Sequence, residues 1–367
     1  MTRKGWCPGA LRPMPAGDGL LLRVRPHGSR LQPAQVAGLA RISAAFGNGQ
    51  LDLGSRATLQ VRGVREDSLP EVQCQLRALE LLDADPWVEA RRNIMTTPFW
   101  REGDGTPELV RRLEEALRNA LDLPPKFGFA IDTGECPVLQ GAPADIRIER
   151  AGGDLLLRAD GMARGERVGP GTVFARIIEL LEWFSATGQA RMAQAVAAGI
   201  VPPIHADSAP DPQASLGKIL HSAPFLFAPF GAVTSQALSE LSGSALRLTP
   251  WRAVLPEGHA RGELWLTDPG DPLLRVSACT GAPGCASSSV ETRALARELA
   301  AIVPVGRHLH VSGCGKGCAH PAPAHVTLTG REGRFDLVLN GPAGGKPVLC
   351  GLTGIDIPDM MRGHLGS

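Results

Sequence analysis

The stretch that decides how this sequence is read is a pair of cysteine segments, Cys279-Thr-Gly-Ala-Pro-Gly-Cys285 and Cys314-Gly-Lys-Gly-Cys318. Both segments are rich in Gly or Pro, which predicts a tight turn around each cysteine pair. If residues 288–303 form a helix that leads back into a strand, the two turns meet. Four thiolates that meet at one point would form a metal centre.

The spacing within each pair bears on the kind of metal centre. Five residues separate the first two cysteines and three separate the second two, whereas structural zinc sites favour about two to four residues between paired cysteines. An iron–sulfur cluster suits the pattern better, because glycines let backbone N–H groups approach the sulfides. Zinc remains an alternative, and so do thiols that bind no metal and serve as core or redox groups.

Composition narrows the class of protein. The chain has 367 residues, 43% of them hydrophobic, enough for two or three domains with their own cores. It has no run of about 18 apolar residues and no signal-peptide core at its start, so we expect no membrane span and a cytoplasmic location. A net charge of +1 argues against a nucleic-acid partner. In the reducing cytosol the four clustered cysteines are better metal ligands than disulfides. The other cysteines are expected to be bystanders: Cys7, Cys74, Cys136 and Cys350.

The cations of this chain are mostly arginine. Of 38 basic residues only five are Lys. Genomic base composition explains such a bias without any function. Alternatively, the arginines clamp a ligand with many carboxylates, because a guanidinium binds a carboxylate through two parallel hydrogen bonds.

The hydrophobic pattern predicts a mixed α+β chain. The first half reads as a βαββα-like unit with one polar sheet face, followed by a second α/β unit with a hairpin around Gly152-Gly153. Residues 1–17 are expected to be a loop, 91–98 a turn and 201–215 a linker. The predicted strands are 19–25, 51–56, 58–62, 126–131, 145–148 and 154–158, and the predicted helices are 31–46, 69–82, 108–121 and 172–187.

The second half of the chain repeats the first. Four segments recur in the same order, which predicts duplication and fusion, although chance similarity between hairpin patterns is the alternative. The pairs are Leu51–Arg56 with Leu246–Trp251, Asn93–Pro98 with Ala278–Pro283, Phe129–Gly134 with Leu309–Cys314, and 143–161 with 323–341. Two copies about a pseudo-twofold axis would leave a cleft for a large ligand. Only the second copy has the cysteines; the first has Asn93, Pro98 and Gly134 nearby.

These features carry a family resemblance over essentially the whole chain. The two cysteine turns, the duplicated halves and the segment Ser55–Gly63 followed by Arg92-Asn-Ile resemble the nitrite/sulfite reductase superfamily. Within it, several softer motifs resemble the precorrin-3B synthase family of aerobic cobalamin biosynthesis. These motifs are Trp6–Pro15, Asp18–Arg25, Leu123–Asp132 and Leu246–Arg252.

The resemblance implies a duplicated α+β fold, with ferredoxin-like half-domains and iron–sulfur-binding α/β domains around a pseudo-twofold axis. The implied organisation is an N-terminal arm (1–17), a first ferredoxin-like half-domain (18–85), a reductase-like domain without a cluster (86–200), a linker (201–215), a second ferredoxin-like half-domain (216–258) and a reductase-like domain that carries the cluster (259–367).

The resemblance also implies chemistry. A [4Fe–4S] cluster would be bound by Cys279, Cys285, Cys314 and Cys318. The implied reaction is the O₂-dependent hydroxylation of precorrin-3A at C20, with closure of a γ-lactone. The family is associated with an additional non-haem iron, whose candidate ligands here are His308, His310, His320 and His325. Asp132 and Glu135 are candidates as ligands or as acid–base groups. Each of these is also explained as a structural residue. Because no dinucleotide-binding or P-loop motif is present, NADH electrons would arrive through a separate reductase or ferredoxin.

The acetate and propionate arms of such a macrocycle require cations. The first candidates are Arg56, Arg62, Arg91, Arg92 and Lys126, and the second are Arg23, Arg25, Arg247 and Arg252, each with an ordinary surface or structural role as the alternative. Sulfite reductases carry a Lys-x-Lys motif where this chain has Lys126-Phe-Gly128. The missing second lysine argues against sulfite reduction as the activity of this chain. Three alternatives remain: a sirohaem-dependent sulfite or nitrite reductase, a non-catalytic iron–sulfur electron carrier and a zinc-stapled binding protein.

Overall fold

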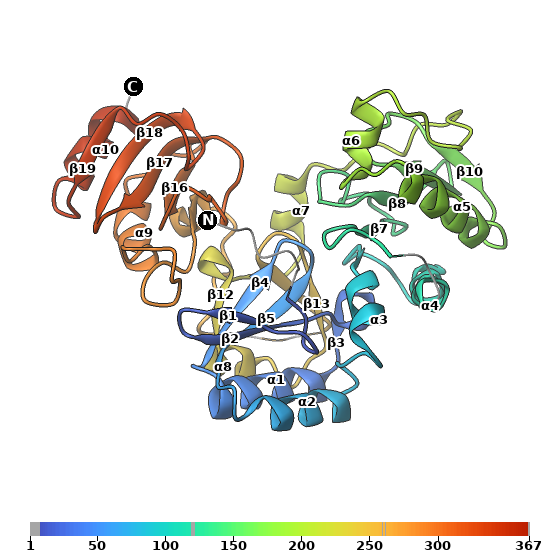
Figure 1. Cartoon of the computed structure of the whole chain (residues 1–367), viewed down its shortest axis with the longest axis horizontal. Coiled ribbons are helices and arrows are strands. Elements are labelled where there is room, and N and C mark those ends of the chain that lie inside the picture. Colours follow the sequence, from blue (N-terminus) through green and yellow to red (C-terminus); the bar gives the residue numbers. More distant parts are fainter. Residues whose placement is uncertain (1–7, 119–121, 259, 261, 366–367) are drawn as a thin grey trace.

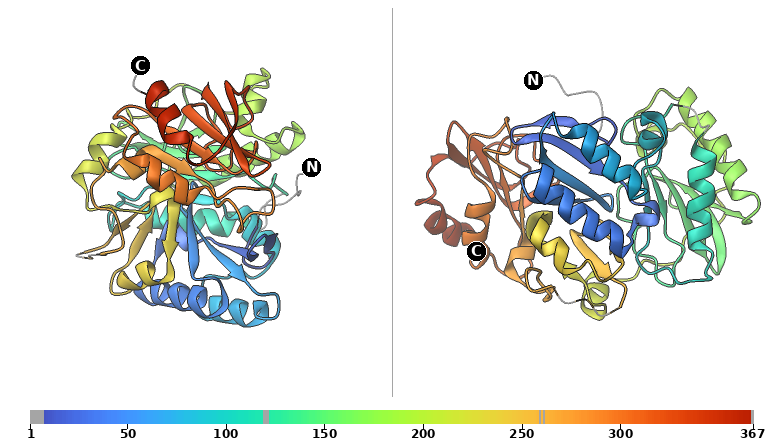
Figure 2. Two further views of the ribbon diagram at one scale, coloured as in Figure 1. Left: turned by 90° about the vertical axis from the view of Figure 1, so that its left-hand side faces the viewer. Right: turned by 90° about the horizontal axis from the view of Figure 1, so that it is seen from below.

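The protein consists of a central pair of half-domains flanked by two α/β lobes (Figure 1). A computed structural model describes residues 8–118, 122–258, 260 and 262–365. The lobe formed by the middle of the chain and the C-terminal lobe, coloured green and red, lie on opposite sides of the blue and yellow centre. The right-hand view of Figure 2 shows the same separation from below. The expected α+β class is confirmed.

Two antiparallel sheets build the centre. The first has the order β1-β2-β5-β4-β12, with β1 (Met14–Ala16), β2 (Gly19–Val24), β5 (Thr58–Val64), β4 (Gln50–Gly54) and β12 (Ala232–Thr234). The second has the order β11-β14-β13-β3, with β11 (Leu226–Phe227), β14 (Ala253–Pro256), β13 (Leu246–Leu248) and β3 (Arg30–Leu31). The associated helices are α1 (Pro33–Phe46), α2 (Leu69–Ala78), α3 (Pro86–Arg91), α7 (Leu216–Ser222) and α8 (Ser235–Glu240).

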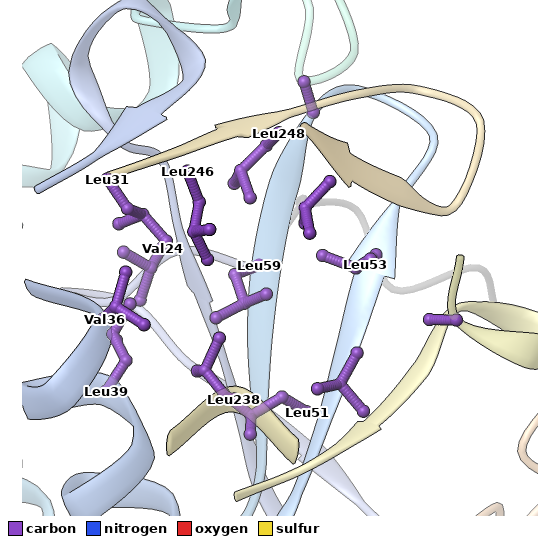
Figure 3. Close-up of a cluster of buried hydrophobic side chains, with 14 of the residues drawn as sticks. Val24, Leu31, Val36, Leu39, Leu51, Leu53, Leu59, Leu238, Leu246 and Leu248 are labelled. Atoms are coloured by element: carbon purple, nitrogen blue, oxygen red, sulfur yellow. The ribbon is translucent and has the colours of Figure 1, made fainter. Parts of the chain in front are cut away.

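The two halves exchange one strand each. Strand β3 of the first half pairs with β13 of the second, with Leu31 opposite Leu246. Strand β12 of the second half pairs with β4 of the first, with Val233 opposite Leu51. Leu31, Leu51 and Leu246 lie in one shared core with α1 and α8 (Figure 3). The two half-domains therefore form a single folding unit around a pseudo-twofold axis.

The two outer lobes have the same topology. The middle lobe has the order β10-β9-β8-β7-β6 and the C-terminal lobe β19-β18-β17-β16-β15, each with three parallel strands followed by two antiparallel ones. The strands are β6 (Ile94–Thr96), β7 (Phe129–Ile131), β8 (Ile146–Ala151), β9 (Asp154–Ala159), β10 (Glu166–Val168), β15 (Val276–Ala278), β16 (Leu309–Ser312), β17 (Ala324–Arg331), β18 (Arg334–Gly341) and β19 (Leu349–Leu352).

Two helices pack on the apolar face of each lobe's sheet. The middle lobe uses α4 (Thr106–Leu117) and α5 (Val173–Ala186), and the C-terminal lobe uses α9 (Arg293–Ala300) and α10 (Ile357–Leu365). A short α6 (Met192–Ala197) follows α5. This match of strand order, direction and helix position agrees with the predicted duplication.

One predicted pairing between the repeats is wrong in register. The N–H of Thr97 donates to the carbonyl of Ile131 (2.8 Å), and the N–H of Cys279 makes the equivalent bond to Val311 (3.4 Å). Thr97 is thus the counterpart of Cys279, three residues away from the predicted alignment of Ile94 with Cys279. The strands involved, β6 and β15, have three residues each, too few for a sequence pattern to fix the register.

Two local expectations are also corrected. Residues 14–16, expected in a loop, form β1 because they pair with β2 across a turn at Gly17 and Asp18. Residues 94–96, expected in a turn, form β6, which is buried beside β7. The expected linker, 201–215, follows the middle lobe, with Ser208 bridged to Gly165. No helix in the described part of the chain is long and apolar enough to cross a membrane.

The exchanged strand gives a first testable prediction. Leu31 is fully buried where β3 meets β13, so Leu31→Ala should lower the free energy of unfolding by about 2–5 kcal/mol through lost burial and a cavity. Leu264→Ala is the matched control, because Leu264 is 51% exposed, and it should change stability by less than about 0.5 kcal/mol. Urea unfolding measures both; equal effects would contradict a shared core at Leu31.

Candidate functional site

The two cysteine turns lie side by side at one edge of the C-terminal sheet. Strands β15 and β16 are parallel neighbours, so their carboxyl ends point the same way. Cys279 directly follows β15, and Cys314 follows β16 after Gly313. The N–H of Gly313 donates to Cys279 Sγ (3.1 Å), which joins the two turns directly. The two cysteine turns therefore meet, as predicted.

The four thiols are free and influence one another. None of the four forms a disulfide; Cys279, Cys285 and Cys314 are half-buried and Cys318 is exposed. Nearby protein atoms still desolvate Cys318 and raise its pKa, and the thiols of Cys314, Cys279 and Cys285 raise it further. Four thiols whose charges repel at one place are a donor set suited to a metal group that neutralises them.

The described side chains are not arranged around a single metal ion. A tetrahedral zinc ion would hold its sulfur ligands within about 4 Å of each other. Within the described ranges, no group of three or more His, Cys, Asp or Glu side chains is arranged to hold a metal ion. The choice between an iron–sulfur cluster and zinc therefore rests on the spacing of the cysteines along the chain, which favours the cluster.

An arginine of the first half-domain holds the first cysteine turn. Arg62, on β5, donates from Nη2 to the carbonyl of Gly284 (2.9 Å), next to Cys285. Its Nε and Nη2 also bind the two carboxylate oxygens of Asp18 (3.0 and 2.9 Å). A Cβ on Gly17 would lie 2.6 Å from the carbonyl oxygen of Pro283, so the β1–β2 turn packs directly on the same segment.

An arginine of the second half-domain holds the second cysteine turn. Arg252, between β13 and β14, donates from Nη2 to the carbonyl of Ala319 (2.5 Å), next to Cys318, and from Nη1 to Ser277 Oγ (3.2 Å). Its burial, and then the neighbouring Arg293, lower its pKa. Each half-domain thus contributes one guanidinium that fixes the position of one cysteine pair. We refer to Arg62 and Arg252 as the arginine clasps.

The four histidines predicted as iron ligands lie together behind the cysteine turns. The rings of His308 and His320 are 4.6 Å apart and those of His310 and His320 are 5.7 Å apart, between centroids. His325 Nδ1 accepts from the N–H of His308 (3.0 Å), and His308 Nε2 contacts Ser277 Oγ (3.0 Å). Burial, followed by repulsion from His320, lowers the pKa of both His308 and His310 to about 4. His308 and His310 are therefore neutral near pH 7.

The five first-rank cations do not form one cluster. Arg56, half-buried on the β4–β5 turn, and Arg62 lie on the central sheet. Arg91 and Arg92 lie at α3, across the centre from the C-terminal lobe (Figure 1). There Arg92 binds both carboxylate oxygens of Asp83 (2.8 Å each). Lys126 is exposed in the loop before β7.

Arg91 and Arg62 are largely engaged within the protein. Arg91 donates to Asp122 (3.0 Å) and to the carbonyl of Arg118 (3.2 Å). Arg62 also contacts Asp52 (3.4 Å), in addition to Asp18 and Gly284. These contacts indicate positioning roles for both guanidinium groups.

Two of the second-rank cations are likewise engaged by residues of the protein itself. Arg25 is buried between Glu89 (3.7 Å) and the carbonyl of Pro8 (3.3 Å). Arg247 stacks on Trp100, 4.0 Å from the ring centroid, and binds Glu257 (2.7 Å). Arg23 lies opposite Gln60 on the central sheet.

Sequence reasoning missed the acidic partners of these cations. Asp18 and Asp52 hold Arg62, and Asp52 also binds Arg293 of α9 (2.6 Å), which links the central sheet to the C-terminal lobe. A signal was present, because Asp52 stands between Leu51 and Leu53 in an alternating strand and so shares the polar face with Gln60. Asp18 lies in a turn and offers no such signal.

Asp132 and Glu135, the other predicted acid–base or ligand residues, lie in the middle lobe. Asp132 is buried and accepts from the N–H groups of Val138 (2.7 Å) and Leu139 (2.6 Å). Its burial outweighs these bonds and raises its pKa to about 6. Glu135 is exposed and pairs with Arg101 (2.7 Å). Neither residue belongs to the cysteine turns.

Comparisons with known proteins agree with this fold. Residues 12–79 match the nitrite/sulfite reductase ferredoxin-like half-domain family. The NirA protein of Mycobacterium tuberculosis has a similar structure, with a TM-score of 0.67 at 18% identity, over 94% of this chain and 79% of that one. The fold is therefore that of the nitrite/sulfite reductase class.

Two relatives identify the family within the nitrite/sulfite reductase class to which this chain belongs. A ferredoxin–nitrite reductase of Synechococcus elongatus is 25% identical over 96% of this chain and 86% of its own length. A precorrin-3B synthase of Sinorhizobium sp. is 30% identical over 94% of this chain and 84% of its own length. The chain belongs to the precorrin-3B synthase family, and with its relatives it is an enzyme of the oxidoreductase type.

The pKa of Asp132 predicts a pH effect on stability. Because its folded pKa is raised from 3.8 to about 6, protonated Asp132 stabilises the fold below pH about 4, and this contribution is lost as the pH rises through about 6. The loss amounts to about 3 kcal/mol. Urea unfolding of Asp132→Asn should lack this component between pH 4 and 7.5, whereas Glu135→Gln, at an exposed carboxylate, should keep it. The same pH dependence in Asp132→Asn and the wild type would contradict the assignment.

Proposed function

We propose that this protein is a precorrin-3B synthase, a monooxygenase that hydroxylates precorrin-3A at C20 and closes the γ-lactone. The observation that carries the proposal is the convergence of four free thiols next to an arginine-bearing central sheet. The proposal is also supported by the 30% identity of this chain to a precorrin-3B synthase over 94% of its length. A cytoplasmic location goes with the proposal, because the substrate is a biosynthetic intermediate.

Cys279, Cys285, Cys314 and Cys318 would hold a [4Fe–4S] cluster, with the arginine clasps fixing the two turns. When bound, such a cluster supplies electrons one at a time for the reduction of O₂. One oxygen atom enters the macrocycle and the other leaves as water, so two electrons must come from NADH. A separate reductase or ferredoxin would deliver them to this chain.

The residues at hand do not fit the additional non-haem iron. Although three histidine rings lie close together behind the cysteine turns, the described residues include no set of three or more ligands arranged for an ion. His308 uses Nε2 on Ser277 Oγ instead. We assign no ligand to such an iron and derive no step through it.

Substrate carboxylates would bind on the polar face of the central sheet. Arg56 lies on the β4–β5 turn, and Arg23 and Gln60 are cross-strand partners on the same sheet. A guanidinium binds an acetate or propionate arm through charge-assisted hydrogen bonds. Arg62, two residues after Gln60 on β5, would instead fix the Cys279–Cys285 turn against the sheet.

A sirohaem-dependent sulfite or nitrite reductase is the second candidate function. It is favoured by the 25% identity to a ferredoxin–nitrite reductase over nearly the whole chain. The purified protein's absorption spectrum separates the two functions: an intrinsic chlorin Soret and red band would overturn the synthase proposal. Anaerobic purification with iron and sulfide counts, followed by titration with precorrin-3A, tests the cluster and the substrate together. A non-catalytic electron carrier would contain the cluster but fail to bind the macrocycle.

The cysteine assignment predicts the effect of removing one thiol. Cys318→Ser should lose iron, sulfide and activity together, because a hydroxyl is a poor substitute for a thiolate on iron. Cys350→Ser is the matched control, since Cys350 is an exposed free cysteine of the same lobe, on β19, and it should keep all three. A brown, fully active Cys318→Ser enzyme would refute the assignment.

The substrate assignment predicts an effect on affinity alone. Arg56→Ala should weaken precorrin-3A binding by about 10- to 100-fold, as expected when a charge-assisted pair worth about 1.5–3 kcal/mol is lost. Its iron and sulfide content should match the wild type. Arg65→Ala serves as the control, because Arg65 is exposed in the loop after β5. Equilibrium titration measures both variants, and unchanged affinity in Arg56→Ala would remove Arg56 from the site.

A further inference from the structure

A cavity of about 410 Å³ lies in the first half of the molecule, away from the cysteine turns. Its walls come from the short helix η1 (His27–Ser29), the end of β6 and helix α4, with Gly28, Thr96, Trp100 and Val110 among them. Its volume falls within the range of about 300–1,000 Å³ that is typical of small-molecule sites. The proposed function assigns nothing to this cavity.

The pseudo-twofold axis shows what fills the equivalent place in the second half. Helix η1 precedes β3, as η2 (Pro229–Gly231) precedes β12, and the two exchanged strands pair reciprocally. Gly28 and Phe230 are the middle residues of these helices and share one backbone conformation, with φ of 60° and 62°. The ring of Phe230 is buried in the core of the C-terminal lobe. Arg297 of α9 lies over it, 5.2 Å from the centroid.

The first half lacks this ring but keeps its surroundings. The buried positions of α4 and α9 correspond, with Leu109 matching Leu295 and Leu113 matching Leu299. Arg111, which lines the cavity, is therefore the counterpart of Arg297. A Cβ on Gly28 would meet only Val110 Cγ1, at 3.9 Å. The cavity thus occupies the place that an aromatic ring takes in the other half.

One wall has become polar where the second half is apolar. Strand registers make Thr96 the counterpart of Ala278. Thr96 is 1% exposed and lines the cavity, and its Oγ1 has no hydrogen-bond partner in the described part of the chain. A buried hydroxyl without a partner is costly. An occupant that forms a hydrogen bond there would relieve that cost.

The charged groups at the rim already have partners. Arg30 binds Glu257 through two hydrogen bonds (2.7 and 2.6 Å), and Arg111 binds Glu108 (2.7 Å). Glu114 contacts His27 Nδ1 (2.7 Å) and Arg92 (3.6 Å). An ionic ligand would have to compete with these pairs, so the cavity favours an uncharged one.

We propose that this cavity is a second binding site, for an uncharged planar aromatic molecule that carries a hydrogen-bonding group at its edge. The ring takes the place that the Phe230 ring has in the other half, and the polar edge reaches Thr96 Oγ1. Arg111 lies on the side from which Arg297 covers Phe230, where a cation attracts an aromatic face. Indole meets these requirements, because its N–H donates to a hydroxyl oxygen.

Calorimetric titration of the full chain with indole tests the site, with toluene as the ligand that lacks a donor. The wild type should bind indole saturably. Gly28→Phe should abolish binding of both ligands, because Phe230 shows that this backbone accepts Phe. The matched control is Gly152→Phe, since Gly152 has φ of 61° and open space around its Cβ position, and it should bind as the wild type does.

A second variant tests the hydroxyl without relying on the first. Thr96→Val keeps the side-chain shape, so it should weaken indole binding by about tenfold and leave toluene binding unchanged. Absence of saturable indole binding to the wild type overturns the proposal, as does wild-type affinity in Gly28→Phe. Equal losses for indole and toluene in Thr96→Val overturn the role of the hydroxyl. None of these measurements involves the cluster or the macrocycle, so they are independent of the proposed function.

Discussion

The reciprocal exchange of β3 and β12 is the constraint on which the rest of the molecule depends. Each strand leaves its own half and completes the sheet of the other, with Leu31 and Val233 buried in one shared core. Glu257 reinforces the exchange by binding Arg30 and Arg247 at once, and its pKa falls to about 2 as a result, chiefly through Arg30. Because neither half-domain has a complete sheet without the other, the two halves form one continuous centre between the outer lobes.

That centre also positions the cysteine turns. Arg62 and Arg252 come from different half-domains, and each donates to a backbone carbonyl beside a cysteine. A third contact, between Asp52 and Arg293, joins the central sheet to α9. The distance between the cysteine pairs is therefore set by the half-domains as well as by the lobe that contains them. A guanidinium suits this task, because its fixed fork holds a carboxylate and a carbonyl at the same time.

The two copies have kept one scaffold and diverged where chemistry is expected. Thr97 and Gly134 stand in the middle lobe where Cys279 and Cys314 stand in the C-terminal lobe. In the opposite sense, the second copy fills its core with Phe230 while the first leaves a cavity at Gly28. The cysteines of the C-terminal lobe and the cavity at Gly28 are each found in one copy, and the other copy has ordinary packed residues at the equivalent place. The duplication thus left one lobe with a cluster of four thiols and its partner with a different opening.

The sequence alone determined the α+β class, the duplication, and the meeting of two cysteine turns, because hydrophobic periodicity and Gly- and Pro-rich turns act locally. It also indicated that His308, His310 and His320 lie near the cysteines, since they flank the second turn. The strand exchange, the register that equates Thr97 with Cys279, and the partners of Arg62 and Arg92 were decided only by the tertiary structure. Strands of two or three residues carry too little pattern to choose a partner. An arginine's role depends on which carboxylates reach it, and Asp18 and Asp83 reach theirs from positions 44 and 9 residues away.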